Sequence, residues 1–133
     1  MDRKVLVADV PAVQPRVTAV LAQERLVFVH TLAAALRALA GEDFDLVLIG
    51  MHFDDSRMFD LLREVRSGSR NSAVPVLCYR MRPLAFMAVS TQVIEVTVKA
   101  LGAQAFADLA GFATEEEGNA ALARLVAAAI GSG

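Results

Sequence analysis

The sequence contains no tryptophan, one tyrosine and one cysteine. The lone cysteine, Cys78, has no partner for an internal disulfide, so we expect a reducing compartment and a cytoplasmic protein. No uninterrupted apolar stretch approaches the roughly 18 residues of a membrane span. The first residues lead directly into a strand pattern without the hydrophobic core of a signal peptide. We therefore expect neither a membrane-spanning segment nor a secretory leader.

Neither sign of charge predominates: the sequence has 13 lysines and arginines and 15 aspartates and glutamates, which gives a net charge of −2. Without a basic stripe, the surface offers little to nucleic acid or to an anionic membrane, and we expect neither as a partner. The chain of 133 residues is 56% hydrophobic and 21% charged, which excludes a disordered protein. This length suits one domain spanning residues 1–133.

The motifs of cofactor chemistry are missing too. There is no GxGxxG sequence and no P-loop. The loop after the first predicted strand contains Pro11 and Pro15, which lack backbone donors, and it has no glycine or hydroxyl to hold a phosphate. His52 lies close in sequence to Asp54 and Asp55, but three polar residues on one loop are a weak metal signal. We expect no cofactor, no metal site and no enzymatic activity.

Strand and helix patterns alternate along the chain. Short apolar runs predict strands at residues 5–8, 26–29, 45–50, 74–79 and 105–107. Amphipathic stripes predict helices between them, with Thr31, Ser56 and Thr114 as N-terminal caps and with Gly41 and Gly102 as stops. Residues 91–101 are rich in β-branched side chains and are also compatible with a strand. We favour a helix there, because Gly102 then ends it and residues 105–107 follow as the fifth strand.

This order of elements resembles the receiver domain of two-component response regulators. The segments that carry the resemblance best are residues 4–9 and 44–49, supported by residues 61–66, 74–77 and 100–103. The resemblance extends from Lys4 to about Ile130 and implies a three-layer, doubly wound (βα)5 fold of the α/β, flavodoxin-like class. Its five-stranded parallel sheet would have the order 2-1-3-4-5.

Receivers of this family accept a phosphoryl group on an aspartate at the end of their third strand. An acidic pair after the first strand holds Mg²⁺, a hydroxyl residue ends the fourth strand, and a lysine follows the fifth; metal and cation offset the charge of the phosphoryl group. By the resemblance, Asp9 matches the first acid, Val10 replaces the second, Gly50 replaces the phosphoacceptor, Arg80 takes the hydroxyl position and Leu109 the lysine position. The resemblance therefore implies a degenerate phosphorylation pocket that has kept one of its functional residues.

Two hypotheses concern charged residues near this pocket. Asp54 or Asp55 could replace the lost acceptor, or both could be solvated loop acids near the start of the third helix. Asp9 and Arg80 could form an ion pair in place of the metal and lysine charges, or Arg80 could extend outward to solvent.

The segment after the fourth strand looks like an insertion, because receivers usually have a shorter connection there. It contains Met81, Leu84, Phe86 and Met87, which is more apolar bulk than a solvated loop requires. In the resembled family the fourth helix, fifth strand and fifth helix form the common partner face. The insertion therefore predicts contact with a signalling protein or with a second copy of the chain. The alternative is that these side chains cover the domain's own core.

Taken together, the sequence predicts a signalling module of two-component type that acts through protein contacts without phosphorylation. A phosphorylatable receiver with a relocated acid is one alternative. A flavodoxin-like domain that binds a small molecule or cofactor is another, because it shares the sheet topology. Little chain follows the last predicted helix, so we expect no DNA-binding output domain after it.

Overall fold

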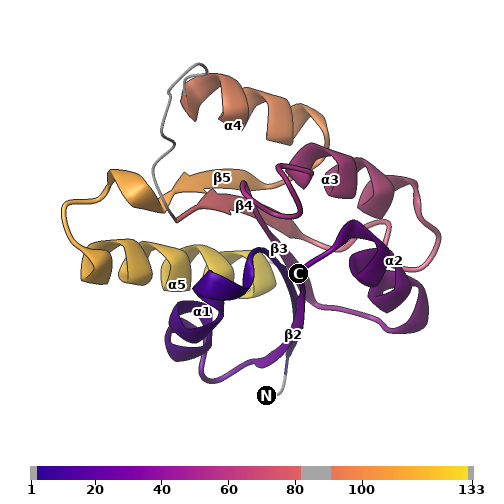
Figure 1. The fold of residues 1–133 in the computed structure, drawn as a ribbon, viewed down its shortest axis with the longest axis horizontal. Helices are drawn as coiled ribbons and strands as arrows, with labels where there is room; N and C mark the ends of the chain where they lie inside the picture. Colours follow the sequence, from indigo (N-terminus) through magenta and orange to yellow (C-terminus); the bar gives the residue numbers. More distant parts are fainter. Residues whose placement is uncertain (1–2, 82–90, 132–133) are drawn as a thin grey trace.

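The computed structural model describes residues 3–81 and 91–131. Strands and helices alternate along the chain as the sequence predicts (Figure 1). In chain order they are β1 (Lys4–Ala8), the 3₁₀ turn η1 (Pro11–Val13), α1 (Gln14–Val20), β2 (Arg25–Val29), α2 (Leu32–Gly41), β3 (Leu46–Gly50), α3 (Met58–Ser67), β4 (Val76–Arg80), α4 (Thr91–Ala100), β5 (Ala105–Asp108), the 3₁₀ turn η2 (Leu109–Gly111) and α5 (Glu115–Gly131).

The strands form one five-stranded sheet in the order β2-β1-β3-β4-β5, and every neighbouring pair is parallel. This confirms the predicted α/β, flavodoxin-like fold with the strand order 2-1-3-4-5. Each residue of β3 is buried, because the strand lies in the middle of the sheet and has helices over both faces. Its continuous apolar sequence is the pattern that such a position requires.

Helices cover both faces of the sheet: α1 and α5 lie on one side, and α2, α3 and α4 lie on the other (Figure 1). Alternate side chains of a strand point to opposite faces. Val5 and Val7 therefore pack with the α1–α5 side, whereas Leu6 and Ala8 pack with the α2–α4 side. Within the described residues, no helix combines the length and apolar character of a membrane span.

Several of the predicted helix ends are confirmed. The hydroxyl of Thr31 accepts a hydrogen bond from the amide of Ala34 at 3.1 Å, and the hydroxyl of Thr114 accepts one from the amide of Glu117 at 3.2 Å. Gly102 follows α4 with a left-handed φ of +105°, as expected of a helix stop.

The predicted cap of α3 is wrong. Helix α3 begins after Arg57, which makes no side-chain capping bond. Ser56 instead has a φ of +66°, whereas an N-cap residue has extended backbone. The chain therefore enters α3 through a left-handed turn.

Residues 91–100 form a helix despite their β-branched side chains. Ile94 and Val98 lie one turn apart and are buried against the sheet, so tertiary packing outweighs the low helix propensity. Val93 and Val96 are left on the outer surface, 54% and 62% exposed.

Candidate functional site at the carboxyl ends of the strands

The residues singled out from the sequence meet where the parallel strands end. Asp9 directly follows β1, Gly50 is the last residue of β3, and Arg80 is the last residue of β4. In the sheet register Gly50 pairs with Tyr79, and Arg80 pairs with Asp108 at the end of β5. In open parallel sheets this edge is where ligands and reacting groups are held.

Asp9 is a buried carboxylate, only 5% exposed. Its Oδ1 accepts a hydrogen bond of 2.7 Å from the amide of Val10, and its main-chain oxygen lies 2.9 Å from Nδ1 of His30. The side chain is therefore turned into the protein and held by the start of the β1–α1 loop.

The Asp9 carboxylate lies against Gly50. A Cβ atom added to Gly50 would stand 2.1 Å from Oδ2 and 2.5 Å from Oδ1 of Asp9. These distances are far below van der Waals contact, so any side chain at position 50 requires Asp9 to move. The Asp9 carboxylate thus occupies the space that a side chain at position 50 would need.

Tyr79 forms a further part of this buried edge. It has no exposed surface and packs in the core on the α1–α5 side of the sheet. Burial, and then the negative charge of the nearby Asp9 carboxylate, raise the pKa of Tyr79 well above its usual range. The phenol therefore stays neutral next to Asp9. The resemblance gave no reason to select this residue.

Arg80 forms a two-point ion pair with Asp108. Its Nε lies 3.0 Å from Oδ1 and its Nη2 lies 2.7 Å from Oδ2 of Asp108. The Arg80 side chain is 7% exposed and that of Asp108 is 26% exposed. The idea that Arg80 extends outward to solvent is therefore wrong. The pairing of Arg80 with Asp9 stays a prediction, and Asp108 was not foreseen as a partner.

Val10 and Leu109, which the resemblance matches to an acid and a lysine of receivers, have apolar side chains. Val10 is half-buried and packs against the core on the α1–α5 side. Leu109 is 3% exposed and belongs to the same core. Neither side chain can supply a carboxylate ligand or a cation to the crevice.

Asp54 and Asp55 occupy a strained turn after β3. Asp54, Asp55 and Ser56 have φ values of +42°, +57° and +66°, a region that disfavours residues with a Cβ. Asp54 Oδ2 accepts a hydrogen bond of 2.7 Å from the amide of Leu32. Asp54 thus binds the first turn of α2, which corrects the expectation of a solvated acid near α3. Asp55 is exposed.

The predicted partner-binding residues are only partly described. Met81 is 8% exposed and packs in the core on the α1–α5 side of the sheet, as the core-covering alternative supposes. Leu84, Phe86 and Met87 lie outside the described residues. Among residues 3–81 and 91–131, no group of three or more histidine, cysteine, aspartate or glutamate side chains is placed to hold a metal ion.

No protein-family model matches the sequence, and no curated protein matches it. Solved structures do resemble it. The chain has the fold of a response-regulator receiver domain. The phosphorylated cyanobacterial phytochrome response regulator RcpA superposes with a TM-score of 0.80 over 100% of this chain and 97% of its own, at 13% identity.

Two other receivers are similar to the chain at 20% identity. A response regulator from Hahella chejuensis has a TM-score of 0.75, covering 93% of this chain and 92% of its own. The receiver domain of a sensor histidine kinase from Pseudomonas aeruginosa has a TM-score of 0.71, covering 98% of this chain and 99% of its own, and holds a magnesium ion in its active-site cleft.

The residues of this chain do not fit such a magnesium ion. Mg²⁺ prefers several oxygen ligands in octahedral geometry. The positions matched to the second acid and to the strand-end acid carry Val10 and Gly50. Among the described residues the buried carboxylate at this edge is Asp9, which already accepts a bond from a main-chain amide. The chain has the receiver fold, and Val10 and Gly50 offer no side-chain oxygen to a metal at this edge of the sheet.

Proposed function

We propose that this chain is a signalling module of two-component type that acts through protein contacts and does not depend on phosphorylation. It is a single domain spanning residues 1–133, works in the cytoplasm and is not an enzyme. The receiver fold, shared with structures such as RcpA, supports the signalling role. Because a fold can host unrelated functions, the main support comes from the crevice.

The observation that carries the proposal is the position of the Asp9 carboxylate against Gly50. Phosphoryl transfer to a receiver needs a carboxylate nucleophile, a metal and a cation around the developing charge. Gly50, Val10 and Leu109 supply none of these. Arg80, the cation at the end of β4, already holds Asp108 at two points.

The relocated-acid alternative finds no support in the loop geometry. The Asp54 carboxylate accepts a bond from the amide of Leu32, at the start of a helix whose dipole favours a negative charge. We therefore propose that the chain functions by binding another protein, and we assign the binding surface to the region of α4, β5 and α5. The partner is a signalling protein or a second copy of the chain.

Incubation with phosphoramidate or acetyl phosphate and MgCl₂, followed by intact mass spectrometry, tests the independence from phosphorylation. We expect no phosphorylated species under conditions in which a receiver with a complete acidic pair, used as positive control, is labelled. Labelling of the wild-type chain that disappears in Asp54→Ala or Asp55→Ala would establish a relocated acceptor and overturn the proposal.

A cofactor-binding role is tested on the same preparation. Neither a chromophore in the absorption spectrum nor a nucleotide in the supernatant after denaturation is expected. A stoichiometric bound nucleotide or flavin would replace the signalling proposal with the flavodoxin-like alternative.

A further inference from the structure

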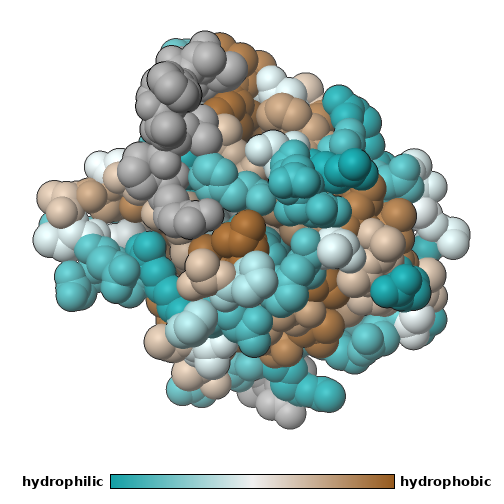
Figure 2. All heavy atoms as spheres, viewed as in Figure 1, coloured by the Kyte–Doolittle hydropathy of each residue, from teal (hydrophilic) through white to brown (hydrophobic). Residues whose placement is uncertain are grey.

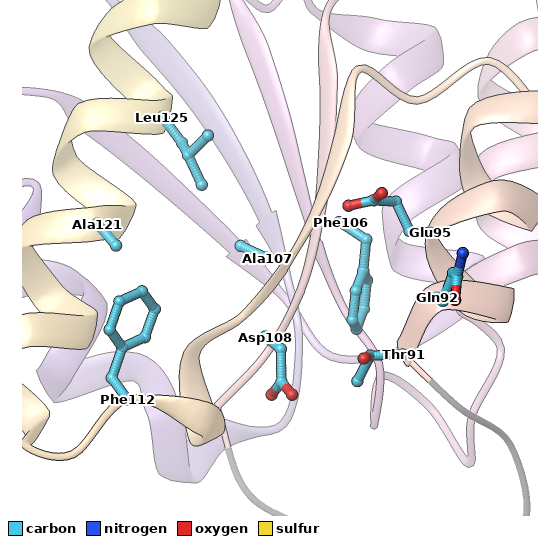
Figure 3. Close-up of a pocket in the computed structure, with 9 residues that line it drawn as sticks. All are labelled: Thr91, Gln92, Glu95, Phe106, Ala107, Asp108, Phe112, Ala121 and Leu125. Atoms are coloured by element: carbon cyan, nitrogen blue, oxygen red, sulfur yellow. The ribbon is translucent and has the colours of Figure 1, made fainter.

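A groove of about 590 Å³ runs between α4 and α5, over the edge strand β5 (Figure 3). Phe106, Ala107 and Asp108 of β5 form its floor. Thr91, Gln92 and Glu95 line it from α4, and Phe112, Ala121 and Leu125 line it from the α5 side. We call this feature the α4–α5 groove.

One large apolar side chain of the groove lies open to solvent, and a second lies beside the groove on α4. Phe112 is one of its lining residues and is 41% exposed. Val96 is 62% exposed and follows Gln92 by four residues, which places it on the same side of α4 as that lining residue. Hydrophobic residues reach the surface over α4 in the space-filling view (Figure 2). Exposed apolar groups gathered around a concave surface are typical of an interaction site.

Acidic side chains accompany the apolar ones. Glu95 lines the α4 wall. Asp108 lies in the floor, where its two-point pair with Arg80 offsets its charge. Glu115, Glu116 and Glu117 form the exposed first turn of α5, a few residues after Phe112. The groove therefore combines apolar contact surface with a negative rim.

The cations near the groove compensate this charge only in part. Lys99 lies 3.8 Å from Glu95, and Arg16 lies 4.0 Å from Glu115. Both contacts are at or near the limit for an ion pair, and exposed pairs of this kind contribute little. A second copy that met this groove with the same face would bring acid against acid, which disfavours a symmetric dimer here.

We propose that the α4–α5 groove binds a segment of a partner protein in which large apolar side chains are flanked by lysine or arginine. The apolar side chains pack on Phe112 and Val96, and the cations face Glu95 and the first turn of α5. This inference rests on the proposed function and specifies the chemistry of its partner.

Two synthetic amphipathic helical peptides test the proposal. One carries leucine on one face and arginine on the other, and its twin carries glutamate in place of every arginine. We expect the arginine peptide to shift the amide signals of Glu95, Val96 and Phe112 in spectra of the ¹⁵N-labelled chain. The glutamate twin should bind at least roughly tenfold more weakly, a difference of about 1.4 kcal/mol. Equal binding of the twins would overturn the proposal.

Matched variants separate groove binding from general attraction to an acidic protein. Glu95→Lys should weaken binding of the arginine peptide. Glu64→Lys, which makes the same charge change on the exposed face of α3, should leave binding unchanged. Phe112→Ser should also weaken binding, with the melting temperature as a check on folding. Equal loss in both charge variants would contradict the groove as the site.

The result of the peptide-binding experiment does not depend on the result of the phosphorylation test. A chain that is unlabelled by phosphoramidate and fails to bind the arginine peptide keeps the proposed function and loses this inference. Sedimentation equilibrium adds one more outcome: a dimer dissociated by Val96→Asp would make a second copy the occupant and overturn the basic partner.

Discussion

Arg80 and Asp108 end neighbouring parallel strands, and their side chains form two hydrogen bonds of 3.0 Å and 2.7 Å. In a two-point pair of this kind the planar guanidinium fits both carboxylate oxygens at once. The pair therefore ties the end of β4 to the end of the edge strand β5, at the floor of the α4–α5 groove.

Removing one partner of this pair should destabilise the chain. Asp108→Asn leaves the buried Arg80 guanidinium without its carboxylate, and we expect a loss of about 2 kcal/mol in the free energy of unfolding. Urea denaturation of Asp108→Asn, Arg80→Met and the double variant gives the coupling between the two residues. Strictly additive losses would show that the pair contributes nothing to stability.

Gly50→Ala should also be destabilising, although alanine suits a strand better than glycine does. The added methyl group would stand 2.1 Å from Asp9 Oδ2, and forcing Asp9 aside should cost about 1–3 kcal/mol. In the Asp9→Ala background the same substitution should be neutral or stabilising. Thermal unfolding of the two single variants and the double variant measures this reversal of sign, and equal effects in both backgrounds would refute the steric account.

The left-handed turn after β3 predicts opposite effects at neighbouring positions. Asp54→Ala removes a carboxylate from the amide of Leu32 and should cost about 1 kcal/mol. Ser56→Gly relieves a φ of +66° and should raise stability by up to about 1 kcal/mol, after allowance for the freer unfolded chain. Ser67→Gly, at a helical position in α3, is the control and should destabilise. The midpoint of urea unfolding reports all three changes.

The buried thiol of Cys78 should lower the free energy of unfolding in mild alkali. Burial raises the pKa of its thiol from 9.0 to about 12. Above pH 9 the unfolded chain releases this proton while the folded chain keeps it, so stability falls as pH rises from 9 toward 12 by about 1.4 kcal/mol per unit. This contribution is fully present below pH 9.

Urea denaturation at pH 8 and pH 10 checks the linkage. The wild-type chain should lose about 1.4 kcal/mol more between these pH values than Cys78→Ala does. Val76→Ala truncates another fully buried residue of β4 without removing a titratable group, so it should keep the wild-type pH dependence. The same pH dependence in all three proteins would contradict the buried, protonated thiol.

Much of the fold could be predicted because its signals are local or periodic. The apolar run that ends at Gly50 specifies a buried parallel strand, and Thr31 and Gly102 act on backbone groups within a few residues of themselves. Even residues 91–100, with their β-branched side chains, were assigned correctly from the position of the glycine that follows.

The site was harder to predict, because its contacts depend on side-chain direction and on backbone strain. Three successive left-handed residues, from Asp54 to Ser56, follow no propensity, so the bond from Leu32 to Asp54 could not be foreseen. Asp108 could not be predicted from the resemblance to receivers, because it lies one residue before the matched position, Leu109. The signal was present: Arg80 and Asp108 end adjacent strands with opposite charges.

The contact between Asp9 and Gly50 has a consequence for how such a chain could change over generations. An aspartate introduced at position 50 by a single substitution would meet the Asp9 carboxylate at once, as two like charges in one buried space. Asp9 would have to turn away first, although a glycine at position 50 forms no contact that stabilises the turned side chain. An acidic side chain at position 50 therefore requires coordinated changes at positions 9 and 50, whereas the glycine that stands there requires none.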